Sequence, residues 1–190
     1  MARSYSLLKV SSWNVCTRSF GGISGAAVFG WIAGESAAAN AKNRSLMDPM
    51  HLEPQLEAGR ELLARLRERE DGPDWKEANT LLQQIMWDYA GLVRSETLLD
   101  AGLHALRRLE EKASATMIAR NSHELMRALE VLNMIEIGEL VFVAARERRE
   151  TRGKHIRVDY PFANPLLQKL LIVKQKEGKP TTEWRNLKRA

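Results

Sequence analysis

Residues 121–161 read NSHELMRALEVLNMIEIGELVFVAARERRETRGKHIRVDYP, and this stretch determines the fold that we expect for the chain. Asn121 followed by Glu124 predicts a helix start, because these two side chains satisfy amides that lack a partner in the first turn. Apolar side chains then occur nearly all round the helix; one stripe, interrupted by Glu136, contains Leu125, Leu129, Leu132, Leu140 and Val143. A helix that is apolar on all sides is buried among its neighbours. We therefore expect residues 122–149 to form the central helix of a bundle.

The apolar part of this helix is too short to cross a membrane. It covers about 15 residues and contains Glu136 and Glu139, whereas a membrane-spanning helix needs about 20 predominantly apolar residues. We expect no transmembrane segment here.

A strongly basic stretch follows the helix. Six cations lie within residues 146–157, namely Arg146, Arg148, Arg149, Arg152, Lys154 and Arg157. Gly153 predicts the end of the helix, and cations in a last turn suit the negative end of the helix dipole. From the residues alone, a solvated basic helix end and a specific binding role both stay open.

Three further helices are expected upstream, each from its own boundary signals. Residues 55–70 form a charged helix, and Asp74 with Glu77 starts the next one as a capping box. Gly91 stops that helix, and Ser95 caps the third. The side chains expected to face the core are Leu56, Leu62, Leu63, Leu66, Leu81, Leu82, Ile85, Met86, Tyr89, Leu99, Leu103, Leu106 and Leu109.

The last part of the chain predicts a short β-hairpin. Residues 170–173 and 181–184 flank a loop of about five residues, 176–180. The expected fold class is therefore mainly α, with an antiparallel bundle of four helices over residues 55–152 and a short C-terminal hairpin.

Composition excludes several classes of function. The net charge is +5, but the 24 acidic and 29 basic residues of the 190 are interleaved, which is typical of a helical surface rather than of a nucleic-acid-binding face. The single cysteine, Cys16, excludes an internal disulfide and a cysteine zinc site, and the four histidines lack ligand spacing. We expect neither a structural metal nor a nucleic-acid partner.

Residues 20–42 are rich in glycine, alanine and serine, and two interpretations stay open. Residues 1–41 could be a secretory signal, with basic residues before an apolar run and a site of small residues after it. Alternatively, Gly21 and Gly22 form a turn that lets backbone approach a ligand, and amides from Ser24 onward begin a helix that points at negative charge.

Residues 129–134, Leu-Glu-Val-Leu-Asn-Met, and 149–161, Arg-Glu-Thr-Arg-Gly-Lys-His-Ile-Arg-Val-Asp-Tyr-Pro, carry a more specific signal. Together they resemble the C-terminal helical domain of a flavoprotein family that contains the flavoprotein subunits of succinate dehydrogenase and fumarate reductase, with L-aspartate oxidase and adenylylsulfate reductase as relatives. The run resembles the family's Arg-Glu-Ser/Thr-Arg-Gly-x-His-x-Arg pattern. Residues 85–102 are similar to a further stretch of the family.

The resemblance implies candidate residues for binding and for contact between domains. Residues 20–45 look like a remnant of the FAD-binding domain, which implies cofactor contacts by Gly21, Gly22, Ser24 and Gly25. Arg18 is the candidate for the family's substrate-binding arginine, although it lies one residue too far from Gly21. The residues implied to tie the helical domain to the flavin domain are Arg94, Arg149, Arg152, His155 and Arg157. For Arg94, capping of helix carbonyls is the open alternative.

The function implied by resemblance is a fragment or split form of an FAD-dependent oxidoreductase of the fumarate reductase/succinate dehydrogenase type. The complete protein would transfer hydride between flavin and a dicarboxylate in the cytoplasm, in places at the inner face of a membrane through a partner. Implied partners are a flavin-domain half or a full-length flavoprotein, and an iron–sulfur subunit. Because no Gly-x-Gly-x-x-Gly fingerprint is present, we expect the chain alone to be inactive.

Two other functions stay open: a helical interaction module without catalysis, and a secreted helical protein with residues 1–41 as its signal. The expected division is an unassigned leader at 1–19, the remnant at 20–45, the bundle domain at 46–161 and the hairpin tail at 162–190.

Overall fold

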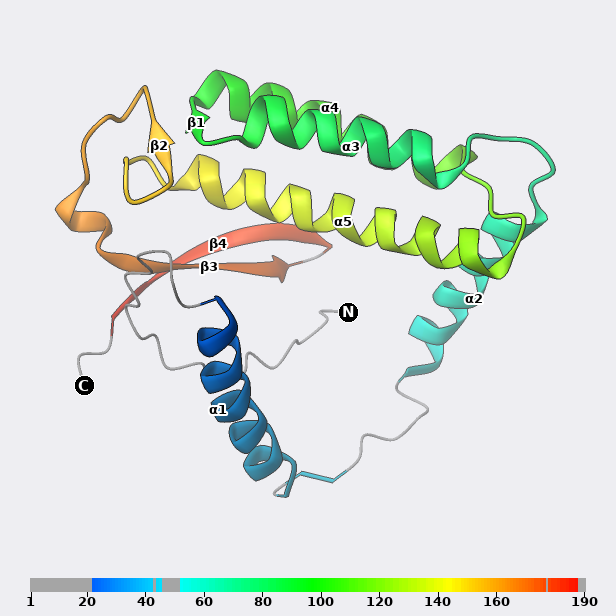
Figure 1. The fold of residues 1–190 in the computed structure, drawn as a ribbon, viewed down its shortest axis with the longest axis horizontal. Helices are drawn as coiled ribbons and strands as arrows, with labels where there is room; N and C mark the ends of the chain where they lie inside the picture. The colour runs from blue at the N-terminus through cyan, green and yellow to red at the C-terminus, as the bar shows by residue number, and fades with distance from the viewer. Residues whose placement is uncertain (1–21, 43, 46–51, 177, 188–190) are drawn as a thin grey trace. The chain divides into compact units, whose positions relative to one another are not determined.

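The computed structural model describes residues 22–42, 44–45, 52–176 and 178–187. The chain divides into two compact units, one ending at residue 54 and the other continuing from residue 55. The first contains helix α1 (Gly22–Lys42). The rest of the chain provides α2 (Glu53–Glu68), α3 (Trp75–Ala90), β1 (Val93–Arg94), α4 (Glu96–Thr116), α5 (Ser122–Glu147), β2 (Ile156–Arg157), the short 3₁₀ helix η2 (Pro165–Leu167), β3 (Lys169–Lys176) and β4 (Lys179–Asn186) (Figure 1).

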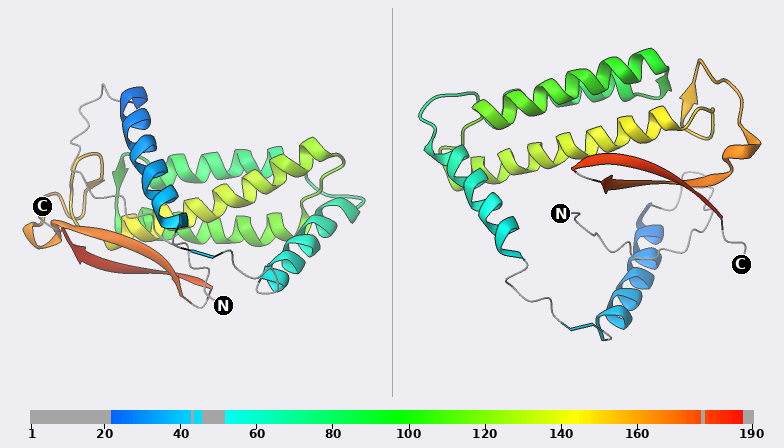
Figure 2. Two further views of the ribbon diagram at one scale, coloured as in Figure 1. Left: turned by 90° about the horizontal axis from the view of Figure 1, so that it is seen from below. Right: turned by 180° about the vertical axis from the view of Figure 1, so that it is seen from behind.

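Helices α3, α4 and α5 lie side by side, each antiparallel to the one before it in the chain, as Figures 1 and 2 show from three directions. This bundle confirms the expected fold class. Helix α2 joins it only through its C-terminal end. There Leu66 is fully buried and its carbonyl accepts the Ala119 amide at 2.7 Å, whereas Leu56 is 49% exposed. The bundle therefore has three full members, not the four that we expected, because the leucines of α2 reach the core only in its last turns.

The buried face of α5 is not the stripe that the sequence indicated. The buried residues follow one another at intervals of three and four: Ala128, Val131, Ile135, Gly138, Phe142 and Ala145. A Cβ added at Gly138 would lie 3.1 Å from a methyl carbon of Leu106 and 3.2 Å from the Met86 sulfur. Because the small residues let α3 and α4 approach closely, this stripe faces the core. The expected leucine stripe flanks it, and Met126, Met134, Ile137 and Leu140 are exposed, so burial on all sides was wrong.

Three helix starts, those of α3, α4 and α5, were predicted correctly, because caps are local. Asp74 accepts a hydrogen bond from the Lys76 amide, Ser95 from the Leu98 amide, and Asn121 from the Glu124 amide. The end of α5 differs from our expectation. The helix stops at Glu147, and Gly153, with φ near +60°, sits in a turn within the following loop instead of ending the helix.

The C-terminal hairpin pairs β3 with β4 along all eight residues of each strand. The last pair is Lys176 with Lys179, so the strands extend into most of the expected five-residue loop. The hairpin is attached to the end of α5, where the Trp184 indole donates to Glu147 at 2.9 Å and Arg148 lies 4.7 Å from the Trp184 ring centre. Among the described helices, none is long and apolar enough to span a membrane.

Candidate functional site

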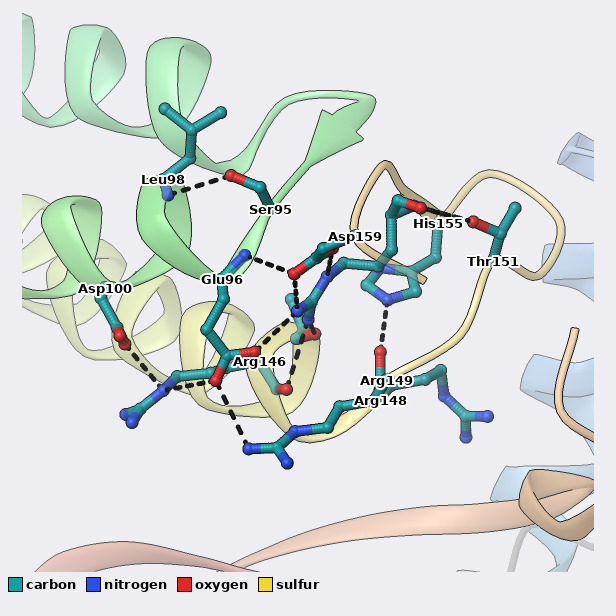
Figure 3. A network of polar contacts seen from close by, with 12 residues as sticks. Ser95, Glu96, Leu98, Asp100, Arg146, Arg148, Arg149, Thr151, His155 and Asp159 are labelled. Atoms are coloured by element: carbon teal, nitrogen blue, oxygen red, sulfur yellow. Dashed lines mark hydrogen bonds and ion pairs between the residues drawn. The ribbon is translucent and has the colours of Figure 1, made fainter. Parts of the chain in front are cut away.

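The basic motif after α5 folds back onto the connection between α3 and α4. Strand β2 pairs in parallel with β1, so Val93 lies beside Ile156 and Arg94 beside Arg157. This pairing brings together residues about 60 positions apart at one end of the bundle (Figure 3). We call the resulting set of ion pairs and hydrogen bonds, built on Arg94, Glu96, Glu150, Arg157 and Asp159, the end network.

Arg157 is the centre of the end network and has no exposed surface. Its guanidinium donates to both carboxylate oxygens of Asp159, at 2.8 and 2.6 Å, and to Glu96 at 2.8 Å. The remaining Nη1 donates to the Ala145 carbonyl at 3.0 Å, at the negative end of α5. A buried guanidinium is tolerated only when its charge and its donors are satisfied. Here two carboxylates and the helix end satisfy them.

Asp159 links this guanidinium to the start of α4. Its second oxygen also accepts the Glu96 amide at 2.8 Å, beside the Ser95 cap (Figure 3). Hydrogen bonds from Arg157 hold the pKa of the Asp159 carboxyl well below its usual value. The carboxylate therefore fixes β2 to the N-terminus of α4 and stays charged far into acid.

Glu150 is a second fully buried charge, and Arg152 binds both of its oxygens at 2.9 Å. It also accepts from Arg148 at 2.6 Å and from the Asn164 amide at 2.9 Å. Burial alone raises the pKa of a carboxyl. For Glu150 the hydrogen bonds from Arg152, Asn164 and Arg148 outweigh that effect, and the pKa lies below its ordinary value.

His155 connects the two sides of the motif, and its partners define its tautomer. Nε2 lies 2.9 Å from the Arg148 carbonyl oxygen, so it carries the proton and donates. Nδ1 lies 2.9 Å from Nη1 of Arg94, which can only donate, so Nδ1 accepts. Burial, and then the charges of Arg94, Arg157 and Arg148, lower the pKa of the ring against the opposing effect of the carbonyl. His155 is thus a neutral imidazole.

Arg94 caps the end of α3. Its Nε donates to the Gly91 carbonyl at 2.8 Å and its Nη2 to the Ala90 carbonyl at 3.1 Å. The geometry is that of the capping alternative, and contact with another domain stays a prediction. Burial lowers the pKa of Arg94, and the charge of Arg157 lowers it further.

Arg149 and Arg152 differ in what they offer to a partner. The Arg149 side chain is 60% exposed and donates to Glu96 at 3.4 Å. Arg152 is held by Glu150, although its side chain is 41% exposed. Of the five arginine and histidine residues assigned to the motif and to β1, Arg149 presents its charge most freely to solvent.

Reasoning from sequence found the cations of the end network but not the acids. Glu96, Glu150 and Asp159 were not singled out, although Glu150 lies between two arginines and Asp159 lies two positions after Arg157. That alternation of opposite charges is the signal that could have found two of them. Glu96 has no such signal, because its partner is 61 positions away.

The N-terminal candidates lie in or before α1. Arg18 and Gly21 lie outside the described residues, and for Gly22 and Ser24 only their helical backbone is described. Gly25 lies inside α1, and a Cβ added there would meet no atom within 4 Å. No cluster of metal-ligating side chains occurs within the described parts of the chain.

The family described as "Fumarate reductase flavoprotein C-term" matches residues 79–190. The chain therefore belongs to this flavoprotein family, and the match includes the whole end network. Among curated proteins, L-aspartate oxidase of Yersinia pestis is 36% identical over 81 residues, which are 42% of this chain and 15% of that protein. An FAD-dependent oxidoreductase of Methanocaldococcus jannaschii is 29% identical over 96 residues, which are 50% of this chain and 18% of that protein.

Solved structures share the fold. FrdA of Escherichia coli quinol fumarate reductase has a TM-score of 0.75 at 22% identity and covers 86% of this chain. Adenylylsulfate reductase of Archaeoglobus fulgidus has a TM-score of 0.69 at 24% identity and covers 83%. The matches use 29% and 28% of those chains, so this chain spans less than a third of their length.

Proposed function

We propose that this chain acts as the helical portion of an FAD-dependent oxidoreductase of the fumarate reductase/succinate dehydrogenase type. In the complete protein, hydride would pass between the flavin and a dicarboxylate in the cytoplasm, with electrons continuing to an iron–sulfur partner. One observation carries the proposal: the motif at 149–161 lies in the segment that the family matches and folds into a satisfied, buried ionic network. Such a network gives the end of the bundle one defined shape, which a docking surface needs.

Exposed apolar residues at that same end support a role in docking. They come from β1, from the residue before it and from the segment after β2, and we call them the end face: Leu92 58%, Val93 53%, Val158 62%, Phe162 83% and Leu166 76% exposed. A group of exposed apolar side chains on one part of a domain is a candidate interaction site. The curated relatives are far longer than the matched segment, and we propose that the flavin-binding portion that makes up their remaining length docks on the end face.

We propose that helix α1 supplies one edge of a flavin site. Gly25, Gly30 and Gly34 leave open space around them, since a Cβ at any of the three would meet nothing within 4 Å. Small residues of this kind let another surface approach the backbone closely. Bound FAD would supply the hydride chemistry; what these residues add is contact along one side. Gly21, Gly22 and Ser24 stay candidates for cofactor contact, and Arg18 stays a candidate for substrate binding.

The decisive experiment is purification of the full chain, with an affinity tag, from the cells that encode it. We expect an oxidised-flavin absorbance band and near-stoichiometric FAD, together with a flavin-binding polypeptide identified by mass spectrometry. Material without flavin, or with a flavin-free partner instead, would overturn the proposal and favour an interaction module without catalysis.

Variants of the end face sharpen this test. Val158→Asp and Phe162→Asp should each lose the flavin, because a charge in the contact must be desolvated. Met126→Asp, on an equally apolar exposed position at the far end of α5, is the matched control and should keep it. Flavin retained by both end-face variants, with unchanged circular dichroism, would place the docking surface elsewhere.

A second experiment uses the recombinant chain without partners. FAD titration followed by flavin fluorescence should show affinity no tighter than about 1 mM, which corresponds to roughly 4 kcal/mol. Dye-linked oxidation of succinate should be undetectable. Stoichiometric FAD on the chain alone would contradict the assignment of most of the site to a docked portion.

A further inference from the structure

We propose that His155 is a pH-sensitive latch that holds the end face in shape only while its ring is neutral. The ring accepts from Arg94 on the α3 side and donates to the Arg148 carbonyl at the end of α5. It therefore links the end of α3 to the end of α5, in addition to the β1–β2 pair and the contacts of Arg157. The influence on docking rests on the proposed function; the latch itself does not.

Protonation of the ring is incompatible with this geometry. A proton on Nδ1 would point at an N–H of Arg94, only 2.9 Å away, and neither group could accept. The charges around the ring oppose protonation as well: Arg94 comes from β1, Arg148 from the end of α5, and Arg157 from β2.

The nearby carboxylates do not compensate for a charged ring. Glu150 is already bound by Arg148 and Arg152, and Asp159 by Arg157. Both have pKa values below their ordinary ones, so they stay charged and stay occupied by the arginines as the pH falls through the histidine range. A proton on His155 must therefore be accommodated by movement of the ring away from Arg94.

Movement of the His155 ring should loosen β2, because residue 155 directly precedes this strand in the chain. The Ile156 amide donates to the Leu92 carbonyl at 3.4 Å and the Val158 amide to the Arg94 carbonyl at 3.0 Å. These two bonds join β2 to the segment around β1. Val158 directly follows β2, Val93 lies in β1, and Leu92 directly precedes β1. Acid should thus release the end face while the α3–α4–α5 core stays packed.

The direction of the pH dependence follows from the linkage between proton binding and opening. The pKa of His155 is lower in the folded chain than its ordinary 6.5, so the opened chain binds more protons as the pH falls. The latch is closed above about pH 6.5 and weakens below it. Between about pH 7.5 and 5.5 the opening equilibrium should rise by roughly three- to tenfold, with tenfold as the ceiling for one group whose folded pKa lies below that range.

Two NMR measurements on the full chain test the latch. Long-range ¹H–¹⁵N correlations should show His155 neutral at pH 7, with its proton on Nε2. Hydrogen-exchange protection factors of the Ile156 and Val158 amides should fall roughly three- to tenfold from about pH 7.5 to about pH 5.5, while that of Ile135 in the core of α5 should not.

Variants separate His155 from other titrations. His155→Gln should remove the pH dependence at Ile156 and Val158, because its amide has no proton equilibrium in this range. His123→Gln, at an exposed position in the first turn of α5, should keep the wild-type dependence. A charged ring at pH 7, a proton on Nδ1, or an unchanged pH dependence in His155→Gln would each overturn the latch. Loss of flavin in the purification above would not affect these readings, so the two proposals fail separately.

Discussion

At the scale of single residues, Arg157 differs from its carboxylate partners in burial. It is fully buried, yet its two carboxylate partners keep about a third of their side-chain surface in water: Glu96 is 33% and Asp159 28% exposed. Removing the cation would leave two acids that can partly rehydrate and carbonyls of α5 that have lost a donor. The cost is therefore set by the broken links between β2, α4 and α5 rather than by a stranded charge alone.

We predict that Arg157→Ala lowers the free energy of unfolding by about 2–3 kcal/mol, somewhat less than the roughly 3–5 kcal/mol for breaking a fully buried pair. Urea denaturation of the full chain measures it. Arg149→Ala is the matched control, because this arginine is 60% exposed and its contact with Glu96 should contribute under about 0.5 kcal/mol. Equal losses in the two variants would show that burial of Arg157 does not matter.

At the scale of elements, α3 and α5 pack so closely on α4 that they leave no room for a side chain at Gly102. A Cβ added at Gly102 would come within 2.4 Å of the Tyr89 Cβ and 2.5 Å of the Phe142 ring. Both contacts are closer than real Cβ atoms show, so a methyl group there must push α3 or α5 away. The close packing of the bundle thus depends on glycine in α4 as well as on Gly138 in α5.

Gly102→Ala should destabilise the chain by about 1–3 kcal/mol through overpacking, despite the better helix propensity of alanine. Gly59→Ala on α2 makes the comparison, since a Cβ there meets nothing within 4 Å. That variant should gain about 0.5–1 kcal/mol from reduced backbone freedom. Thermal or urea unfolding of both decides it. A stabilised Gly102→Ala would mean that the three helices are spaced more widely.

A feature could be predicted from the sequence when its partners are near in the chain, and it could not when they are distant. The caps at Asp74, Ser95 and Asn121 were found because each bonds an amide two or three residues away. The buried stripe of α5 was missed, since the choice between two apolar stripes depends on how Gly138 fits against α3 and α4. The arginines of the motif were found through resemblance, but their carboxylate partners depend on a pairing that only the fold creates.

At the scale of the whole molecule, the chain has two units of very different burial. The core of α5 contains fully buried residues such as Phe142, whereas Ile23 is 92% and Trp31 72% exposed on α1. Burial stabilises by about 25 cal/mol per Å² of apolar surface. Helix α1 therefore gains little from packing, and its internal glycines each cost about 0.5–1 kcal/mol relative to alanine.

We predict that limited proteolysis removes α1 by cleavage near Arg44 and leaves a stable helical core. In hydrogen exchange, amides of residues 22–42 should be lost within the dead time while those of residues 125–145 persist. Mass spectrometry of the fragments and of the exchange reads both. Protection of α1 equal to that of α5 would contradict this, and the chain bound to a flavin-binding portion is the state in which we expect such protection.

We predict that the end network forms late in folding. Most contacts within the bundle join helices that follow one another in the chain, α3 with α4 and α4 with α5. By contrast, Arg157 reaches Glu96 and His155 reaches Arg94 across 61 positions each. Contacts between positions far apart in the chain form late, because closing a long loop costs entropy until neighbouring helices have packed together. Replacing Arg157 should hence leave the refolding rate nearly unchanged and accelerate unfolding, giving a φ-value near zero in a chevron, while Gly102→Ala slows refolding. The motif that identifies the family would then slow unfolding of a bundle that has already assembled, and it would have little effect on the folding rate.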